Sequence, residues 1–196
     1  MTTAAAATSR EAQKDDLNAL LGGRPIVLVG MMGAGKTTVG RRLATRLGRH
    51  FVDSDEEVER AAGMSIEDMF ATHGEADFRA GEARVVARLL KEADLVLGTG
   101  GGAFVNPETR ALVKASAVSV WIKADFELLF ARVQRRANRP LLKTANPRET
   151  LQALIDKRYP VYAEADVTVL SKDVPQDQVA TEIIEALLAH LGGRHG

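Results

Sequence analysis

Gly30-Met31-Met32-Gly33-Ala34-Gly35-Lys36-Thr37 is the stretch that decides the fold. It fits the pattern G-x-x-x-x-G-K-[ST] without a mismatch, after the apolar run Ile26–Val29 and before a segment with helical spacing. Glycines let such a loop curl so that backbone N–H groups point at phosphate oxygens. Lys36 adds a compact cation, and Thr37 offers a hydroxyl oxygen to Mg²⁺. The stretch therefore predicts a strand, a phosphate-binding loop and a helix that together bind ATP or GTP with magnesium.

Short apolar runs alternate with amphipathic stretches beyond this loop. The patterns predict strands at His50–Val52, Leu95–Leu97, Ala117–Ile122 and Val167–Leu170, and helices at Thr37–Leu47, Asp125–Arg136 and Gln176–Leu191. This alternation indicates an α/β fold whose parallel sheet is covered on both faces, with ligands bound beyond the carboxyl ends of the strands. The segment 137–147 contains two prolines and small polar residues, so we expect a lid loop there.

Length and composition predict one domain with an appendage. The chain has 196 residues, of which 45% are hydrophobic and 27% are charged, as in ordinary globular proteins. Residues 25–196 carry the strand and helix pattern and form the predicted domain. Residues 1–24 lack it and predict a flexible extension, or a short surface helix around Glu11–Leu21.

The composition also excludes several classes of function. The chain has no cysteine, which excludes disulfides, thiolate nucleophiles and zinc–thiolate or iron–sulfur sites. Basic and acidic residues number 26 each, and this balance argues against a nucleic-acid binder. No apolar run approaches the roughly 18 residues that span a bilayer. We therefore expect a cytoplasmic protein that acts on small molecules without membrane or nucleic-acid partners.

Acidic residues and glycines follow two of the predicted strands. Alternation puts Asp53 and Asp55 on the same side of the chain, near the phosphate-binding loop. One carboxylate suits the hydrated magnesium ion, and the other suits an acceptor hydroxyl. The alternative role for an aspartate at this position is to cap the N-terminus of a helix. Gly100-Gly101-Gly102 follows a strand directly and predicts either a ligand that touches the backbone or a tight connection.

Three arginines stand where anions are expected, namely Arg79, Arg139 and Arg158. An arginine fork binds a carboxylate through two hydrogen bonds, and a mobile arginine neutralises charge on a transferred phosphoryl group. A solvated surface charge is the alternative role for each of them.

Together, GMMGAGKTTVGRRLA, DSD, DFR, GTGGGA, RPLL and KRYPVY resemble the shikimate kinase family in order and spacing over about residues 25–191. The resemblance implies a three-layer P-loop kinase fold with strand order 2-3-1-4-5. It implies a monomer that transfers the ATP γ-phosphoryl group to the 3-hydroxyl of shikimate, on the pathway to chorismate and the aromatic amino acids.

The resemblance also implies roles for individual residues. Asp55 holds the shikimate hydroxyls and is the candidate base, Arg79 and Arg158 clamp the carboxylate, and Gly101 with its neighbours Gly100 and Gly102 contacts the substrate. The implied ATP-binding residues are Gly33, Ala34, Gly35, Lys36, Thr37 and Thr38, with Arg139 over the phosphates and Arg132 and Pro175 beside the adenine. Thr37 and Asp53 are the implied magnesium residues, and Lys36, Asp55 and Arg139 the implied catalytic residues.

Three alternatives remain open at this stage. A gluconate kinase-like enzyme would share the phosphate-binding loop and differ in its acceptor. A regulatory GTPase would carry a D-x-x-G element after a strand and an N-K-x-D motif, and neither occurs here. The last alternative is an inactive scaffold, against which the intact set of cationic residues argues.

Overall fold

A parallel sheet of five strands forms the centre of the protein. The computed structural model describes the backbone of residues 2–135 and 145–193, and side chains from residue 11 onward within these ranges. The strands are β1 (Ile26–Val29), β2 (His50–Asp53), β3 (Leu95–Gly98), β4 (Val118–Ala124) and β5 (Val167–Ser171). Their order is β2-β3-β1-β4-β5, as predicted, and all the pairings are parallel.

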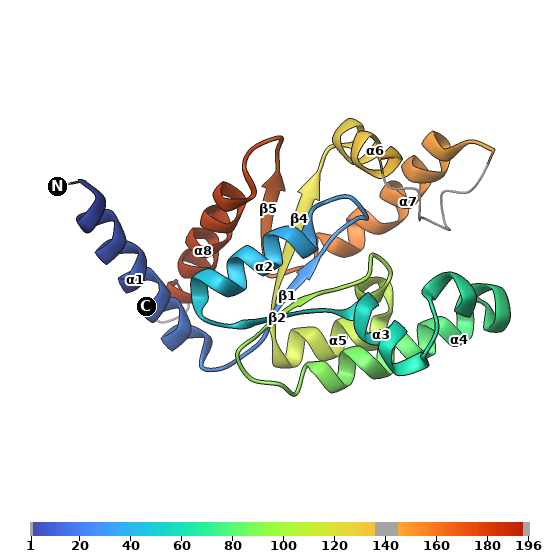
Figure 1. Ribbon diagram of the computed structural model, residues 1–196, viewed down its shortest axis with the longest axis horizontal. Helices are drawn as coiled ribbons and strands as arrows, with labels where there is room; N and C mark the ends of the chain where they lie inside the picture. The colour runs from blue at the N-terminus through green and yellow to red at the C-terminus, as the bar shows by residue number, and fades with distance from the viewer. Residues whose placement is uncertain (1, 136–144, 194–196) are drawn as a thin grey trace.

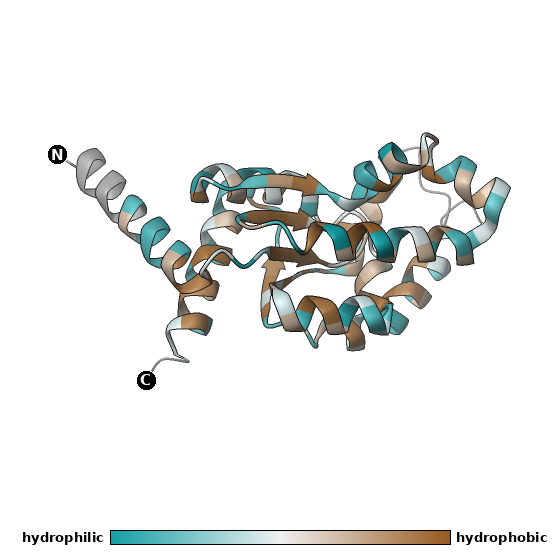
Figure 2. Ribbon diagram, turned by 90° about the horizontal axis from the view of Figure 1, so that it is seen from below, coloured by the Kyte–Doolittle hydropathy of each residue, from teal (hydrophilic) through white to brown (hydrophobic). Residues whose placement is uncertain are grey.

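Helices cover both faces of the sheet (Figures 1 and 2). Helices α2 and α8 pack together on one face, and α4 and α5 lie on the other. The described helices are α1 (Thr2–Leu21), α2 (Lys36–Leu47), α3 (Ser54–Ala62), α4 (Ile66–Leu89), α5 (Pro107–Ser116), α6 (Phe126–Gln134), α7 (Pro147–Tyr162), α8 (Gln176–Gly192) and the 3₁₀ turn η1 (Ala103–Val105). This arrangement confirms the predicted three-layer α/β fold.

Burial explains why the central strands read as continuous apolar runs. Every residue of β1 and β3 is buried, because helices cover both faces of these strands. Helix α2 approaches the sheet closely at Gly40, where a Cβ atom would lie 2.8 Å from Phe51 Cδ2 and 3.0 Å from Leu28 Cδ1. The apolar face of α2 and the β1 run together place the phosphate-binding loop at the carboxyl edge of the sheet.

The end of α1 packs into the protein. Leu17 and Leu21 are fully buried, and Asn18 Nδ2 donates a hydrogen bond of 2.9 Å to the Leu47 carbonyl. The buried Arg49 donates to Asn18 Oδ1 and to the Arg24 carbonyl, each at 2.8 Å. The residues expected to form an extension thus include a helix anchored on α2 and α8. The division of the chain at residues 24 and 25 stays a prediction.

Leu17→Ala will measure how strongly α1 is held. We expect the free energy of unfolding to fall by about 2–5 kcal/mol, because the substitution leaves a cavity at a fully buried position. Chemical denaturation followed by circular dichroism gives this value. Leu112→Ala is the matched control, since Leu112 lies on α5 and is 46% exposed. Equal small losses in the two variants would mean that α1 does not pack in solution.

The predicted lid lies mostly outside the described residues. Residues 136–144 are not described, and α7 begins at Pro147, because proline suits the first turn of a helix. Helix α6 ends at Gln134, with Arg135 as its C-cap, before the predicted end at Arg136, and Arg136 itself lies outside the described residues. Among the described residues, no helix is both long and apolar enough to cross a membrane.

Candidate functional site

The phosphate-binding loop follows β1 and ends where α2 begins. Gly30, Gly33 and Gly35 have positive φ angles of 142°, 81° and 99°, which glycine adopts without steric cost. A Cβ atom on Gly30 would lie 2.6 Å from the Ile122 carbonyl oxygen, so the loop also needs glycine for its close approach to β4. The loop delivers the N-terminus of α2 to the sheet edge, where its N–H groups and dipole favour anions.

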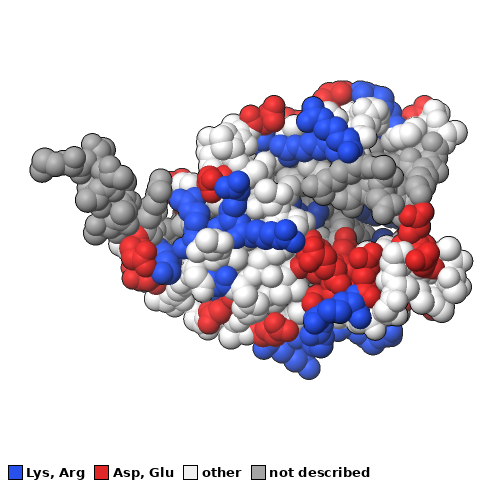
Figure 3. All heavy atoms as spheres, in the orientation of Figure 1, with Lys and Arg blue, Asp and Glu red and all other residues white. Residues whose placement is uncertain are grey.

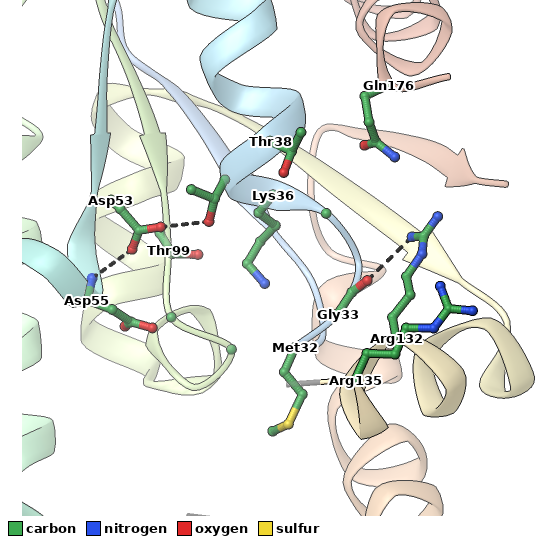
Figure 4. Close-up of a pocket in the computed structure, with 14 residues that line it drawn as sticks. Met32, Gly33, Lys36, Thr38, Asp53, Asp55, Thr99, Arg132, Arg135 and Gln176 are labelled. Atoms are coloured by element: carbon green, nitrogen blue, oxygen red, sulfur yellow. Dashed lines mark hydrogen bonds between the residues drawn. The ribbon is translucent and has the colours of Figure 1, made fainter. Parts of the chain in front are cut away.

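Lys36 is the first residue of α2, and its side chain extends back over the phosphate-binding loop. Its Nζ donates hydrogen bonds to the Gly30 carbonyl at 2.8 Å and to the Met31 carbonyl at 2.9 Å. Figure 4 shows the ammonium group directed into the pocket. The geometry places one fixed positive charge where the loop would receive a phosphate group.

Thr37 and Asp53 meet across the same edge of the sheet. Thr37 Oγ1 donates to Asp53 Oδ2 at 2.8 Å, while Asp53 Oδ1 accepts from the Asp55 backbone N–H at 3.0 Å (Figure 4). Asp53 is therefore the N-cap of α3, and it also lines the pocket, while its role toward magnesium stays a prediction. The hydroxyl and carboxylate oxygens suit a hard divalent cation that keeps much of its water. No cluster of three or more acidic or histidine ligands for a metal occurs in the described ranges.

A cavity of about 410 Å³ joins these groups. Many of the predicted site residues line it: Gly33, Gly35, Lys36, Thr37, Thr38, Asp53, Asp55, Gly100, Gly101 and Arg132. Met32, Thr99, Arg135 and Gln176 also line it, and the sequence pattern did not single them out. Ala34 is buried behind the loop, and Pro175 is exposed at the start of α8. Arg139 lies outside the described residues.

The triple glycine brings together the residues that the sequence predicts for substrate binding. A Cβ atom on Gly100 would lie 2.5 Å from Asp55 Oδ1, and one on Gly101 would lie 3.1 Å from Arg158 Nη1. A Cβ atom on Gly102 would lie 2.7 Å from Arg79 Nη2. Side chains from α3, α4 and α7 therefore converge on one turn after β3, next to the Gly30 carbonyl, which lies 3.6 Å from the Gly101 Cβ position.

Glu82 is a member of this cluster that the sequence pattern did not reveal. It is 2% exposed, and its Oε2 forms an ion pair of 2.7 Å with Arg79 Nη1. Burial raises the pKa of the Glu82 carboxyl, while Arg79 and Arg158 act in the opposite direction. The spacing of Arg79 and Glu82 on α4 was the available signal, but the same spacing is common on solvated helices.

Arg158 and Tyr162 come from successive turns of α7. Arg158 is 7% exposed, which is unusual for an arginine and excludes a solvated surface role. The Tyr162 hydroxyl donates a hydrogen bond to the Gly101 carbonyl, and burial raises its pKa to about 12. Tyr162 thus stays protonated at neutral pH and ties α7 to the glycine turn.

Gly102→Ala tests how tightly this turn holds Arg79. The added methyl group must displace the guanidinium, which can move, so we expect thermal stability to change little. We expect the KM for the acceptor to rise about tenfold, because Arg79 leaves its position beside the turn. Gly192→Ala is the control for thermal stability, since its Cβ would have no neighbour within 4 Å and its φ is not positive. An unchanged KM would show that the Arg79 position is not constrained by Gly102.

Arg132 lies on the opposite side of the cavity from Asp53. It reaches from α6 and donates to Ser171 Oγ at 3.0 Å and to the Lys172 carbonyl at 3.2 Å. A longer contact of 3.4 Å reaches the Gly33 carbonyl (Figure 4). These bonds hold its guanidinium at the outer end of the cavity, away from the glycine turn.

A parallel sheet of order 2-3-1-4-5 with this loop at its carboxyl edge defines a P-loop kinase. The sequence profile of the shikimate kinase family matches residues 32–188. The chain belongs to this family, whose members are ATP-dependent phosphotransferases.

Two shikimate kinases agree with this assignment, while a gluconokinase shares the fold alone. A shikimate kinase of Bradyrhizobium diazoefficiens is 57% identical over 178 residues, which are 91% of this chain and 86% of that protein. The structure of a shikimate kinase from Acinetobacter baumannii in complex with shikimate matches with a TM-score of 0.84 at 40% identity, covering 88% of this chain and 97% of that one. A gluconokinase from Sinorhizobium meliloti shares the fold, with a TM-score of 0.61 at 17% identity and coverage of 88% and 96%.

Proposed function

We propose that this protein transfers the γ-phosphoryl group of ATP to the 3-hydroxyl of shikimate. The observation that carries the proposal is the convergence of Asp55, Arg79 and Arg158 on the glycine turn, beside the loop that carries Lys36. A cyclic acid with neighbouring hydroxyls fits such a site, because the arginines suit its carboxylate and the aspartate its hydroxyls. The Acinetobacter structure with bound shikimate supports this choice of acceptor.

The nucleotide side of the proposal follows from the loop. Residues 33–38 would bind the ATP phosphates, with Arg132 toward the adenine, and Arg139 would close over the phosphates as the sequence predicts. Thr37 and Asp53 would hold Mg²⁺, Asp53 through water. When bound, the ion neutralises charge on the phosphate oxygens. Lys36 would hold the β- and γ-phosphates so that the acceptor hydroxyl lies in line with them.

Asp55 would orient the acceptor hydroxyl and receive its proton. Its backbone N–H is fixed by Asp53, so its carboxylate projects from the first turn of α3 toward Gly100. Arg79 and Arg158 would bind the far end of the acceptor and thereby decide which hydroxyl reaches Asp55. Phosphoryl transfer needs little covalent chemistry from the protein, so this positioning is the main contribution of these residues.

We further propose that the protein acts as a monomer on small molecules in the cytoplasm. Its charge distribution supports a small anionic substrate rather than a nucleic acid. On the face seen in Figure 3, basic and acidic side chains lie in separate small groups, and neither sign covers the face. The formal net charge of zero agrees with this distribution.

A substrate panel with detection of released ADP tests the proposal. ATP and Mg²⁺ are supplied with shikimate, quinate or gluconate, and we expect rapid ADP release with shikimate only. Lys36→Ala is the matched inactive variant, and Lys91→Ala, at an exposed position remote from the cavity, is the control. Faster release with gluconate would replace the proposed acceptor, and no release with any of the three would overturn the proposed activity.

A further inference from the structure

The turn formed by Gly100, Gly101 and Gly102 needs glycine for reasons of space. None of the three has a positive φ, whereas a Cβ atom at each would lie 3.1 Å or less from a neighbouring side chain. Glycine loses more conformational freedom on folding than any other residue, so three in succession do not hold a turn in one conformation by themselves. Contacts from other elements must therefore fix the conformation in which Gly100 and Gly101 line the cavity.

Each peptide unit along this turn is held by one hydrogen bond. The Gly100 N–H donates to Ser54 Oγ at 2.9 Å, and the Gly101 carbonyl accepts from the Tyr162 hydroxyl. Between them, the Gly100 carbonyl accepts from the Ala103 N–H at 3.2 Å. Because a peptide unit is planar, each hydrogen bond also orients the other polar group of its unit, including the Gly101 N–H. The two outer bonds come from side chains of α3 and α7 and tie the turn to those helices.

Both hydroxyls are sealed inside the protein. Ser54 is 0% exposed and Tyr162 is 1% exposed. The Tyr162 ring packs against Trp121 at a centroid distance of 6.0 Å, and its hydroxyl has a second, weaker contact of 3.9 Å to Met31 Sδ. Side chains with so little accessible surface do not contact a molecule in the cavity, so each hydroxyl can act on a substrate only through the turn.

Each hydroxyl also lies beside a residue assigned to the substrate. Ser54 precedes Asp55 in the first turn of α3, and Tyr162 follows Arg158 by one turn of α7. The turn therefore lies between the residue assigned to the acceptor hydroxyls and a residue assigned to the acceptor carboxylate.

We propose that Ser54 and Tyr162 are positioning residues for the acceptor. Their hydroxyls hold the glycine turn in one conformation, and this conformation sets the separation between Asp55 and Arg158. A rigid cyclic acid spans the two residues only when that separation matches its length. The inference rests on the proposed binding of shikimate at this turn.

Steady-state kinetics of Ser54→Ala and Tyr162→Phe test this inference. Each variant leaves one polar group of the turn unpaired, so we expect the KM for shikimate to rise about three- to tenfold. The Kd for ADP, measured by calorimetry, should stay unchanged, because neither hydroxyl takes part in the bonds that hold Lys36 over its loop. Ser54→Thr keeps the hydroxyl and should keep the wild-type KM.

Two variants at hydroxyls outside the turn are the matched controls. Ser119→Ala removes a fully buried hydroxyl that donates to Asp166 Oδ2 at 2.7 Å. Tyr159→Phe removes a hydroxyl of α7 that donates to the Ala124 carbonyl. Thermal melts of all the variants report the loss of stability, and the controls should lose stability without a change in the KM for shikimate.

The double variant Ser54→Ala/Tyr162→Phe shows whether both residues act through the same turn. Groups that act through one shared element have non-additive effects. The rise in KM should therefore be smaller than the product of the two single rises. A rise equal to that product would mean that the residues act independently, and it would remove the shared turn from the inference.

An unchanged KM in both single variants would overturn the inference, and so would an equal rise in the two controls. A KM for Ser54→Thr as high as that for Ser54→Ala would remove Ser54 from it. If Ser54→Ala does not fold, Tyr162→Phe decides alone, because its ring keeps the contact with Trp121. All these results leave the proposed function intact as long as wild-type protein releases ADP with shikimate. Wild-type protein that releases none would overturn the proposed function together with this inference.

Discussion

Asp55→Asn should lower kcat by about 100-fold or more while changing the Kd for ADP by less than about threefold. An amide cannot take the proton of the acceptor hydroxyl, and a positioned base contributes about 10²–10⁴-fold to a rate. The nucleotide should be little affected, because Lys36 and Thr37 make their contacts from α2 and the Asp55 backbone N–H to Asp53 is retained.

Steady-state kinetics with shikimate and calorimetry with ADP measure these two quantities. Asp16→Asn is the matched control, since Asp16 is exposed on α1. A small and equal effect on kcat and on ADP binding would count against Asp55 as the residue that handles the hydroxyl. A large loss of ADP binding would instead place Asp55 in the nucleotide site.

Arg158→Ala should raise the KM for shikimate by about 10- to 100-fold, and Arg79→Ala should do the same. Each arginine would lose a charge-assisted hydrogen bond to the substrate carboxylate, which is worth about 1.5–3 kcal/mol. ADP binding should change little, because neither residue lines the nucleotide cavity.

Arg148→Ala controls for removal of an arginine from α7, since Arg148 lies at its exposed start and pairs with Glu127. Removing Arg158 also takes away one of the positive charges that stabilise the buried Glu82 carboxylate, so a thermal melt must accompany the kinetics. An unchanged KM in both variants would remove the carboxylate clamp from the mechanism.

Elements whose local pattern agrees with their burial were predictable from the sequence. The apolar runs at 26–29 and 95–97 form buried strands, and the spacing of Val39, Leu43 and Leu47 gives the inner face of α2. The strand order came from the resemblance to a family, because periodicity alone does not say which strands are neighbours. Within α4, Gly74 takes φ 81° and ψ 173° and interrupts the helix, which no spacing of apolar residues reveals.

The candidate site was predictable where a residue type has one dominant use. The phosphate-binding loop is such a case, since its glycines and Lys36 have few other reasons to occur together. Glu82 and Gln176 were missed because a glutamate or a glutamine on a helix is usually solvated, and only tertiary packing buries their oxygens. The anchoring of α1 was missed for the same reason, since nothing in the sequence around Leu17 and Leu21 shows that α2 and α8 cover them.

The glycine turn after β3 limits the ways in which this protein could evolve resistance to an inhibitor. Any larger residue at position 100, 101 or 102 would crowd Asp55, Arg158 or Arg79 respectively. Consider an inhibitor that fills the space against this turn. A larger residue in the turn would exclude the inhibitor, but it would also displace a side chain assigned to the natural substrate. Selection for resistance would be directed to other parts of the pocket.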